Sequence, residues 1–322
     1  MVERHIIQEA LKQTLKGTDF KGLGELYRGK VRDNYIGEEK RIIVTTDRIS
    51  AFDRVLGTLP FKGQVLNRVA RFWFEQTADL VPNHLLSTPD PQVMEVVSCT
   101  PMPVEMVVRT YLTGSTSTSI LTHYEKGGRL FCGNPLPEGM RKHQKLEKPI
   151  LTPSTKAEHG DHDISCSRDE ILAMNRITAA EFDEMAEMSF RLFAFGQAHC
   201  AKQGLILVDT KYEFGKTRDG RIVVIDEIHT PDSSRFWQRA SYDKAFAAGE
   251  NPEGLDKEYV RTWLKSEHGF MGDGDIPHIP DEIQVEAASR YIQACEQITG
   301  ETFVPDTEPP LERIARNLGV TH

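Results

Sequence analysis

Cysteine is scarce in this sequence of 322 residues, and its distribution argues against two classes of protein. The five cysteines are odd in number and scattered, and none forms a Cys-x-x-Cys pair. Neither a disulfide framework nor a zinc ribbon has this pattern, whereas proteins of a reducing compartment commonly do. We therefore expect a cytoplasmic protein. The five residues are Cys99, Cys132, Cys166, Cys200 and Cys295.

Long apolar runs and an excess of basic residues are also missing. No run approaches the roughly 20 apolar residues of a membrane span, and residues 1–17 lack the uninterrupted apolar centre of a signal peptide. The 39 Lys and Arg residues are outnumbered by 48 Asp and Glu residues, which argues against a general nucleic-acid binder. We expect neither a membrane nor a nucleic acid as partner, while a local cluster of cations could still bind a small anion.

The residues that are present predict a folded α+β protein. A hydrophobic content of 39% is enough for one large domain or two to three small lobes. Apolar spacing predicts helices over residues 5–16, 64–77 and 179–203, and Thr178 with Glu181 forms a capping box before the last of these. Two further helices are predicted at residues 283–298 and 311–317, and we expect them to have only a packing role.

The N-terminal third alternates between strand-forming runs and turns. Residues 25–47 predict two strands joined by a turn at residues 37–40. Pro101 and Pro103 interrupt two later β-rich runs, and because proline lacks an N–H group we expect a connector between strands there. We place a lobe boundary at this connector, which gives a β-rich lobe over residues 1–103 and an α/β lobe over residues 104–322.

The most informative segment is residues 205–237, which predicts a β-hairpin with its turn at residues 217–220. The strand alternation places Asp209, Lys211 and Glu213 on one face. Leu207 falls on the same face, and the opposite face takes Ile206, Val208, Thr210, Tyr212 and Phe214.

Two acidic residues, Asp226 and Glu227, end the apolar second strand of this hairpin. Carboxylates that meet across a hairpin repel unless a cation or a shared proton intervenes, so Glu213 with Asp226 indicates a magnesium site. The alternative is a solvated hairpin with cross-strand ion pairs. The apolar residues that flank Asp226 favour the first interpretation, because a buried acid usually has a partner.

Two short segments have the composition of anion sites. Asp232 and Arg235 lie in a turn-forming run with two serines, where a guanidinium and loop amides can bind phosphate or carboxylate. Arg109 leaves an apolar strand just before Gly114 and Ser115, a short loop that can hold phosphate oxygens. A capped turn with a surface arginine is the alternative for each segment.

Gly29 and Lys30 lie between strand-forming residues, where backbone could approach a phosphate chain beside an ammonium group. The sequence contains neither a P-loop nor a complete Gly-x-Gly-x-x-Gly motif, so a purely structural turn is the alternative. Residues 152–167 form a polar loop without periodicity that carries Lys156 and Asp163. His159 and His162 in this loop could bind a metal, but a loop that covers the substrate explains the composition better.

Six segments, taken together and in this order, resemble the SAICAR synthetase family. They are LYRGKVRD, TTDRISAFD, PVEMVVRTYLTGS, LTPSTKAEHGDHDIS, LVDTKYEFG and DEIHTPDSSRFW. The resemblance extends from about Leu26 to Trp237. It implies a two-lobed α+β fold in which a β-rich N-terminal lobe covers an α/β lobe, distantly similar to protein kinases and ATP-grasp enzymes, with ATP between the lobes.

The resemblance also implies a reaction in de novo purine biosynthesis. The family uses ATP to join L-aspartate to the carboxylate of carboxyaminoimidazole ribonucleotide (CAIR), through an acyl phosphate, and releases ADP and phosphate. The substrates are small molecules, magnesium accompanies ATP, and no obligate protein partner is implied.

The family motifs assign roles to particular residues here. Gly29 and Lys30 would contact the ATP phosphates, and the stretch from Pro101 to Glu105 would meet adenine. Glu213 and Asp226 would hold magnesium. Lys211 would face the reacting carboxylate, and Asp209 would assist the metal site or orient Lys211. The residues that would contact the substrates are Arg109, Ser115, Lys156, Asp163, Asp232 and Arg235.

Two other functions compete with this assignment. A kinase-like phosphotransferase that acts on a hydroxyl would fit two lobes, but the sequence has no His-Arg-Asp or Asp-Phe-Gly segment to supply its catalytic groups. A nucleotide-binding regulatory protein would have no need for the charges of Lys211, Glu213 and Asp226. The sequence does not distinguish aspartate from other amines as the second substrate, and it leaves the oligomeric state open.

Overall fold

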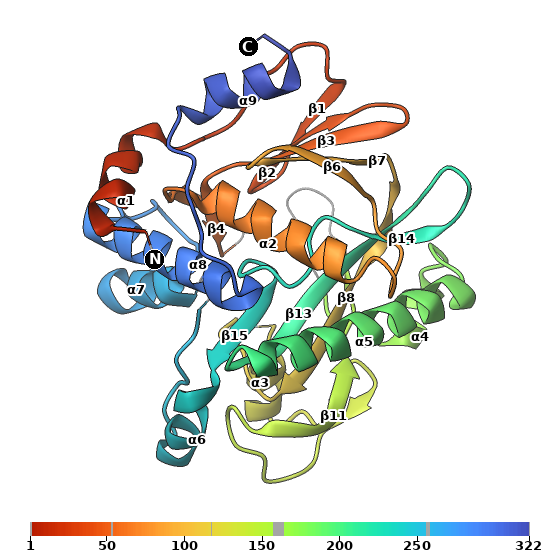
Figure 1. Cartoon of the computed structure of the whole chain (residues 1–322). Coiled ribbons are helices and arrows are strands. Elements are labelled where there is room, and N and C mark those ends of the chain that lie inside the picture. The colour runs from red at the N-terminus through yellow and green to blue at the C-terminus, as the bar shows by residue number, and fades with distance from the viewer. Residues whose placement is uncertain (1, 53, 117, 157–163, 256–257, 322) are drawn as a thin grey trace.

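The computed structural model describes residues 2–52, 54–116, 118–156, 164–255 and 258–321. Two antiparallel sheets form its centre, and helices cover them (Figure 1). The strands are β1 (Glu25–Arg28), β2 (Arg32–Ile36), β3 (Lys40–Thr45), β4 (Arg48–Ala51), β5 (Arg54–Thr58), β6 (Leu85–Asp90), β7 (Val93–Val97), β8 (Thr100–Tyr111), β9 (Leu130–Phe131), β10 (Asn134–Pro135), β11 (Lys145–Leu151), β12 (Ser154–Thr155), β13 (Leu205–Lys216), β14 (Ile222–Ile225) and β15 (Ser234–Gln238). The helices are α1 (Arg4–Ala10) with a 3₁₀ turn (Leu11–Gln13), α2 (Lys62–Gln76), α3 (Ile120–Glu125), α4 (Arg168–Ala173), α5 (Ala179–Lys202), α6 (Arg239–Ala248), α7 (Glu258–His268), α8 (Asp281–Thr299) and α9 (Pro310–Leu318).

The N-terminal sheet has the strand order β1-β2-β3-β7-β6. The turn at residues 37–40 is confirmed, since Gly37 N–H donates to the Lys40 carbonyl at 3.0 Å. The prediction of two strands over residues 25–47 is wrong. The first predicted strand is interrupted after Arg28, so this segment forms the three strands β1, β2 and β3. A tight turn forms there, in which Gly29 N–H donates to the Arg32 carbonyl at 2.8 Å. Gly29 and Lys30 therefore lie at the tip of a β1-β2 hairpin.

The second sheet has the order β11-β8-β13-β14, with β12 pairing with β8 and β15 with β13. Its centre is the antiparallel pair β8 and β13. The prediction of a connector at Pro101 and Pro103 is wrong, because both prolines lie inside β8. Strands β7 and β8 are separated by Ser98 and Cys99 instead. Both prolines lie near the start of the strand, where a missing N–H group disturbs the ladder least.

The β13-β14 hairpin and its turn at residues 217–220 are confirmed, but the alternation of β13 is only partly as predicted. Tyr212 and Phe214 enter the main core, opposite the face of Lys211 and Glu213. Leu207 enters the main core too, although we predicted it on the face of Lys211. The register with β15 shifts between Leu207 and Asp209, and such a β-bulge inverts the alternation before it. Ile206 and Val208 consequently pack in a separate cluster with Tyr111 and Trp237.

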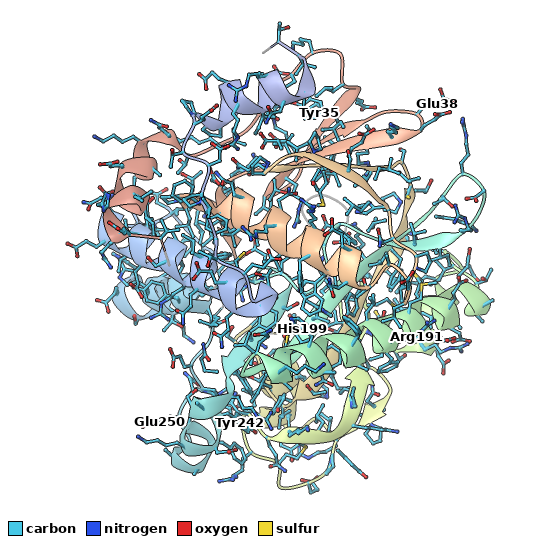
Figure 2. The ribbon with its side chains drawn as sticks, viewed as in Figure 1. Tyr35, Glu38, Arg191, His199, Tyr242 and Glu250 are labelled. Atoms are coloured by element: carbon cyan, nitrogen blue, oxygen red, sulfur yellow. The ribbon has the colours of Figure 1, made fainter. Side chains whose placement is uncertain are left out.

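Most of the predicted helices are present with small changes of length. The helix predicted at 64–77 is α2, and α5 begins with the expected capping box, in which Thr178 and Glu181 bond reciprocally. The helix predicted at 5–16 ends as a 3₁₀ turn at Gln13. His199 of α5 donates a 2.7 Å hydrogen bond from Nε2 to the Ile298 carbonyl of α8, and Figure 2 shows it where these helices meet.

The C-terminal helices pack against the N-terminal part of the chain. Helix α8 lies along α2, and α9 covers the N-terminal sheet (Figure 1). Ile314 of α9 is fully buried in a cluster with Tyr35, Val44 and Val93, and the buried Arg313 donates to Asp90 at 2.9 Å. The last helices therefore complete the core of a sheet formed by the first third of the sequence. Among the described residues, no helix has the length and apolar character that a membrane crossing requires.

Candidate functional site

A buried ion cluster occupies the centre of the β8-β13 pair. Glu105 of β8 lies opposite Glu213 of β13, and the Lys211 ammonium lies between them, 2.9 Å from Glu105 and in direct contact with Glu213. Burial would lower the pKa of Lys211, but the neighbouring Glu213 and Glu105 carboxylates outweigh it and raise that pKa well above its usual value. Lys211 is therefore a fixed positive charge.

The first of three connected pockets, here called the hairpin pocket, lies between the two sheets and has a volume of about 570 Å³. Its wall includes Gly29 and Lys30 at the hairpin tip, and Pro101 and Lys211 from the second sheet. Arg48 fixes the tip, since its guanidinium donates to the carbonyls of Gly29 at 2.9 Å and Lys30 at 3.0 Å. The size falls in the range of small-molecule pockets.

Two acidic residues in the hairpin pocket carry opposite pKa shifts. Burial would raise the pKa of Glu213, but the ammonium groups of Lys211 and Lys156 hold it well below its usual value. Burial raises the pKa of Asp226 to about 6, against the attraction of Arg32 and with the help of the Glu213 charge. The two carboxylates are thus close enough to repel each other.

Arg32 compensates the acids at this end of β14. Its guanidinium lies 3.2 Å from Asp226 and 2.7 Å from Glu227. Among the described residues, no group of three or more His, Cys, Asp or Glu side chains could hold a metal ion. A pair such as Glu213 and Asp226 nevertheless fits Mg²⁺, which commonly uses one or two carboxylates and takes its other ligands from water and phosphate.

The second pocket, here called the arginine pocket, adjoins the first at Glu105 and Lys211 and has a volume of about 260 Å³. Asp209 lines it, and one of its carboxylate oxygens accepts from Arg235 at 2.6 Å and from Arg109 at 3.3 Å. Arg109 also donates to the Thr152 hydroxyl at 2.9 Å. One buried acid therefore aligns two guanidinium groups, which together carry more positive charge than it neutralises.

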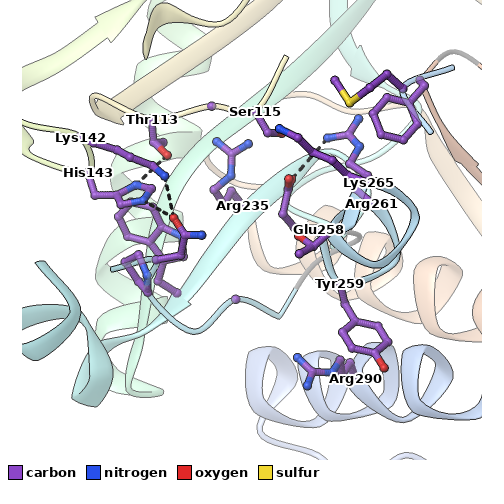
Figure 3. A pocket seen from close by; sticks show the side chains of 18 residues that line it. Thr113, Ser115, Lys142, His143, Arg235, Glu258, Tyr259, Arg261, Lys265 and Arg290 are labelled. Atoms are coloured by element: carbon purple, nitrogen blue, oxygen red, sulfur yellow. Dashed lines mark hydrogen bonds and ion pairs between the residues drawn. The ribbon is translucent and has the colours of Figure 1, made fainter. Parts of the chain in front are cut away.

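The third pocket, here called the cationic pocket, continues from Ser115 and Arg235 and has a volume of about 450 Å³. Figure 3 shows Arg235 with Lys142 and His143 on one side, and with Ser115 and the α7 side chains Glu258 and Lys265 on the other. Arg261 and Lys265 add positive charge from α7, and Arg261 pairs with Glu258 at 3.6 Å. Further cations in the wall are Lys142 and Arg290, and His143 also lines it, with its pKa lowered by burial. This pocket is suited to an anionic group.

Most of the residues singled out in the sequence line these three pockets. The structure brings together Gly29, Lys30, Pro101, Glu105, Arg109, Ser115, Lys156, Asp209, Lys211, Glu213, Asp226, Asp232 and Arg235. Two of them differ from expectation. The Glu105 carboxylate binds Lys211 although we expected it beside adenine, and Asp209 contacts two arginines although we expected it at the metal or at Lys211. Asp163, with His159 and His162, lies outside the described residues.

Sequence reasoning missed several residues of the site. Arg32 and Arg48 belong to quoted family segments, yet no local pattern indicates that they reach Asp226 and the hairpin tip. Arg261 and Lys265 lie in a helix that has the ordinary composition of a solvated surface. Only the packing of α7 beside Arg235 reveals their contribution.

Comparison with known proteins identifies the family. The SAICAR synthetase family model matches residues 25–274. A phosphoribosylaminoimidazole-succinocarboxamide synthase of Legionella pneumophila is 50% identical over 297 residues, which is 92% of this chain and 95% of that protein. The chloroplastic synthase of Arabidopsis thaliana is 47% identical and aligns with 97% of this chain and 77% of its own length.

Solved structures agree with this result. The SAICAR synthase of Saccharomyces cerevisiae, solved in complex with SAICAR, has a TM-score of 0.76 at 29% identity, over 91% of this chain and all of that one. A SAICAR synthetase solved in complex with ADP has a TM-score of 0.65 at 25% identity, over 87% of this chain and all of that one. The match of family model, full-length relatives and fold shows that this chain belongs to the SAICAR synthetase family.

Proposed function

We propose that the three connected pockets bind ATP with Mg²⁺, CAIR and L-aspartate, and that the chain joins the last two to give SAICAR, ADP and phosphate. The family catalyses this ATP-dependent condensation in purine biosynthesis. The substrates are small molecules. The cytoplasmic location expected from the sequence stays a prediction, which cell fractionation would test.

The observation that carries the proposal is the position of Lys211. Its ammonium lies where the hairpin pocket, with its two acids and its glycine turn, meets the arginine pocket. A phosphoryl donor in the first pocket and an anionic acceptor in the second would bring their reacting groups together at this ammonium. Fixed positive charge at that position favours an attack by carboxylate on phosphate, because it offsets the repulsion of two anions.

The proposed chemistry has two displacement steps. A carboxylate oxygen of CAIR attacks the γ-phosphorus of ATP, the bond from that phosphorus to the bridging oxygen breaks, and ADP leaves. The amine of aspartate then attacks the carbonyl carbon of the acyl phosphate. The carbon–oxygen bond breaks, phosphate leaves, and the amine loses a proton to form the amide.

On the donor side, Gly29 and Lys30 would contact the ATP phosphates from the hairpin tip, and Pro101 would line the adenine end. Glu213 and Asp226 would hold Mg²⁺, which when bound would neutralise phosphate charge. Lys156 and Lys211 both pair with Glu213. Both ammonium groups would face phosphate and carboxylate oxygens, with Lys211 also held by Glu105 at 2.9 Å.

On the acceptor side, Arg109, Ser115 and Arg235 would bind the CAIR phosphate. Asp209 would hold the two guanidinium groups side by side, since one of its oxygens accepts from both. The cationic pocket would extend this anion site, with room for carboxylates of aspartate. Asp163 would contact the ribose or imidazole, a role that rests on the family motif alone.

Release of ADP tests the function directly. Purified protein with ATP and Mg²⁺ is assayed with CAIR alone, with L-aspartate alone, and with CAIR and each amino acid in turn. We expect rapid ADP release only with CAIR and L-aspartate together, with SAICAR as product. Release that needs no CAIR, or that accompanies phosphorylation of a hydroxyl compound, would reject the proposal.

A further inference from the structure

The carboxylate of Asp232 receives hydrogen bonds from two helices that are distant in sequence. Lys62, the first residue of α2, donates to one oxygen at 2.6 Å, and the hydroxyl of Tyr291 in α8 donates to the other at 2.5 Å. The Lys62 ammonium also lies 5.3 Å from the centre of the Tyr291 ring. The Asp232 side chain is only 8% exposed, and its residue lines the hairpin pocket near Lys211 and Arg32.

Lys62 occupies a position that local rules disfavour. Its side chain is fully buried, and it lies in the first turn of a helix, where the helix dipole repels a cation. Burial of an ammonium is costly unless acids compensate it. Asp232 does so directly, and Asp47, which accepts from Gly63 N–H at 2.8 Å, adds a second negative charge near the helix start. Such local conflicts are concentrated at functional sites.

The environment of Asp232 restricts what it can bind. A carboxylate has about four acceptor positions, and each of its oxygens already holds one donor in a fixed direction. Any substrate group that binds this carboxylate must bring an N–H or O–H donor, whereas a phosphate would be repelled by the negative charge. The imidazole amino group and ribose of CAIR offer neutral donors, as do the adenine and ribose of ATP. We favour CAIR because Asp232 directly precedes Ser233, which lines the arginine pocket proposed for CAIR.

We propose that Tyr291 and Lys62 are positioning residues, which hold the Asp232 carboxylate in the orientation that accepts a hydrogen bond from the imidazole or ribose of CAIR. This inference rests on the proposed function and deepens it. It gives α8 a role at the site in addition to packing, since Tyr291 is the residue through which that helix reaches Asp232. Loss of either donor lets the carboxylate rotate, so the cost falls on CAIR recognition and leaves ATP binding intact.

The test is a double-mutant cycle of Tyr291→Phe and Asp232→Asn, with kinetics measured separately for CAIR and ATP. Tyr291→Phe keeps the ring and removes only the donor. We expect kcat/KM for CAIR to fall about 10-fold, as for a lost hydrogen bond to a charged group, while KM for ATP stays within about twofold. In the Asp232→Asn background, Tyr291→Phe should cause no further loss, because it acts through the carboxylate.

Tyr124→Phe is the matched control, since the Tyr124 hydroxyl donates to the Pro137 carbonyl at 2.8 Å in a separate cluster. It should leave both kinetic constants unchanged. Lys62→Met is a second variant, for which we also expect a lower kcat/KM for CAIR and a nearly unchanged KM for ATP. Because this substitution can unfold the protein, the result for Tyr291→Phe decides whether the inference holds.

Three results would overturn the inference. They are an unchanged kcat/KM for CAIR in Tyr291→Phe, losses that multiply in the double variant, or an effect on ATP as large as that on CAIR. Failure of the proposed function would look different, because the wild-type protein would then release no ADP in response to CAIR and aspartate.

Discussion

The Lys211 ammonium lies 2.9 Å from a carboxylate oxygen of Glu105 on the neighbouring strand, directly opposite Glu213. One cation thus holds together two acids that would otherwise repel across the β8-β13 ladder. Glu105 also accepts a weak hydrogen bond from Ser154 at 3.4 Å. Because both carboxylates orient Lys211, its ammonium has little freedom to move away from a substrate. A preorganised charge of this kind is worth more in a transition state than a mobile one.

Replacement of Lys211 by alanine should reduce kcat about 100-fold or more while ATP binding changes little. The physical reason is that the ammonium acts on charge developing during transfer. Lys216→Ala is the matched control, since Lys216 lies at the exposed end of the same strand and pairs with Glu181. Steady-state kinetics and nucleotide titration measure both effects, and near-normal turnover in Lys211→Ala would remove this residue from the mechanism.

Asp226→Asn should abolish magnesium-dependent ADP release without unfolding the protein. The amide keeps the shape and loses the charge that a divalent cation requires. Asp226 has a φ of 67°, and asparagine tolerates this left-handed conformation well. Asp219→Asn in the exposed hairpin turn is the control, because that residue pairs only locally, with Thr217 and Arg221. Full activity of Asp226→Asn at ordinary magnesium concentrations would reject the metal site.

The affinity for Mg²⁺ should fall below about pH 6. Burial raises the pKa of Asp226 to about 6 from an ordinary 3.8, and a proton on this carboxylate competes with the metal. Below pH 6 the apparent dissociation constant should rise by up to about tenfold for each pH unit. Titration with Mg²⁺ from pH 5 to 8 measures it. A constant affinity over that range would mean that Asp226 is not a ligand.

The same pKa predicts how stability changes with pH without metal. Between about pH 4 and 6 the folded protein holds a proton on Asp226 that the unfolded chain has lost, so this group's contribution to stability is present below pH 4 and is lost as the pH rises through 6. Asp226→Asn should remove this part of the pH dependence. Urea denaturation of the wild-type protein and of Asp226→Asn at pH 4.5 and 6.5 tests this. From pH 4.5 to 6.5 the free energy of unfolding should fall more in the wild type than in the variant. An equal change in the two proteins would contradict the prediction.

Asp209→Asn should destabilise the protein by about 3 kcal/mol, because it leaves two partly buried guanidinium groups facing each other without their shared acid. Asp209 contacts Arg109 and Arg235 with one oxygen. Asp243→Asn, on the exposed surface of α6, is the control and should change stability by less than about 0.5 kcal/mol. Denaturant midpoints measure both. Equal stability of the two variants would show that the arginines do not depend on Asp209.

Local sequence patterns predicted much of the fold. The capping box at Thr178 and the turn after Lys216 form where expected, since both depend on side chains within a few residues of one another. The face of Lys211 and Glu213 follows from the alternation of any strand. Leu207 was placed on the wrong face because a bulge depends on pairing with β15, which no local pattern encodes.

The sequence by itself determined which residue types could carry the chemistry, and the tertiary structure decided what each of them faces. Glu213 and Asp226 could be paired from one hairpin, because the turn between them fixes their separation. Arg32, Lys62 and Tyr291 could not be assigned, because they meet Asp226 and Asp232 only when segments about 60 to 195 residues apart pack together. Contacts of that kind arise from the burial of α2 and α8 and from the docking of two sheets, and nothing in the neighbouring residues specifies them.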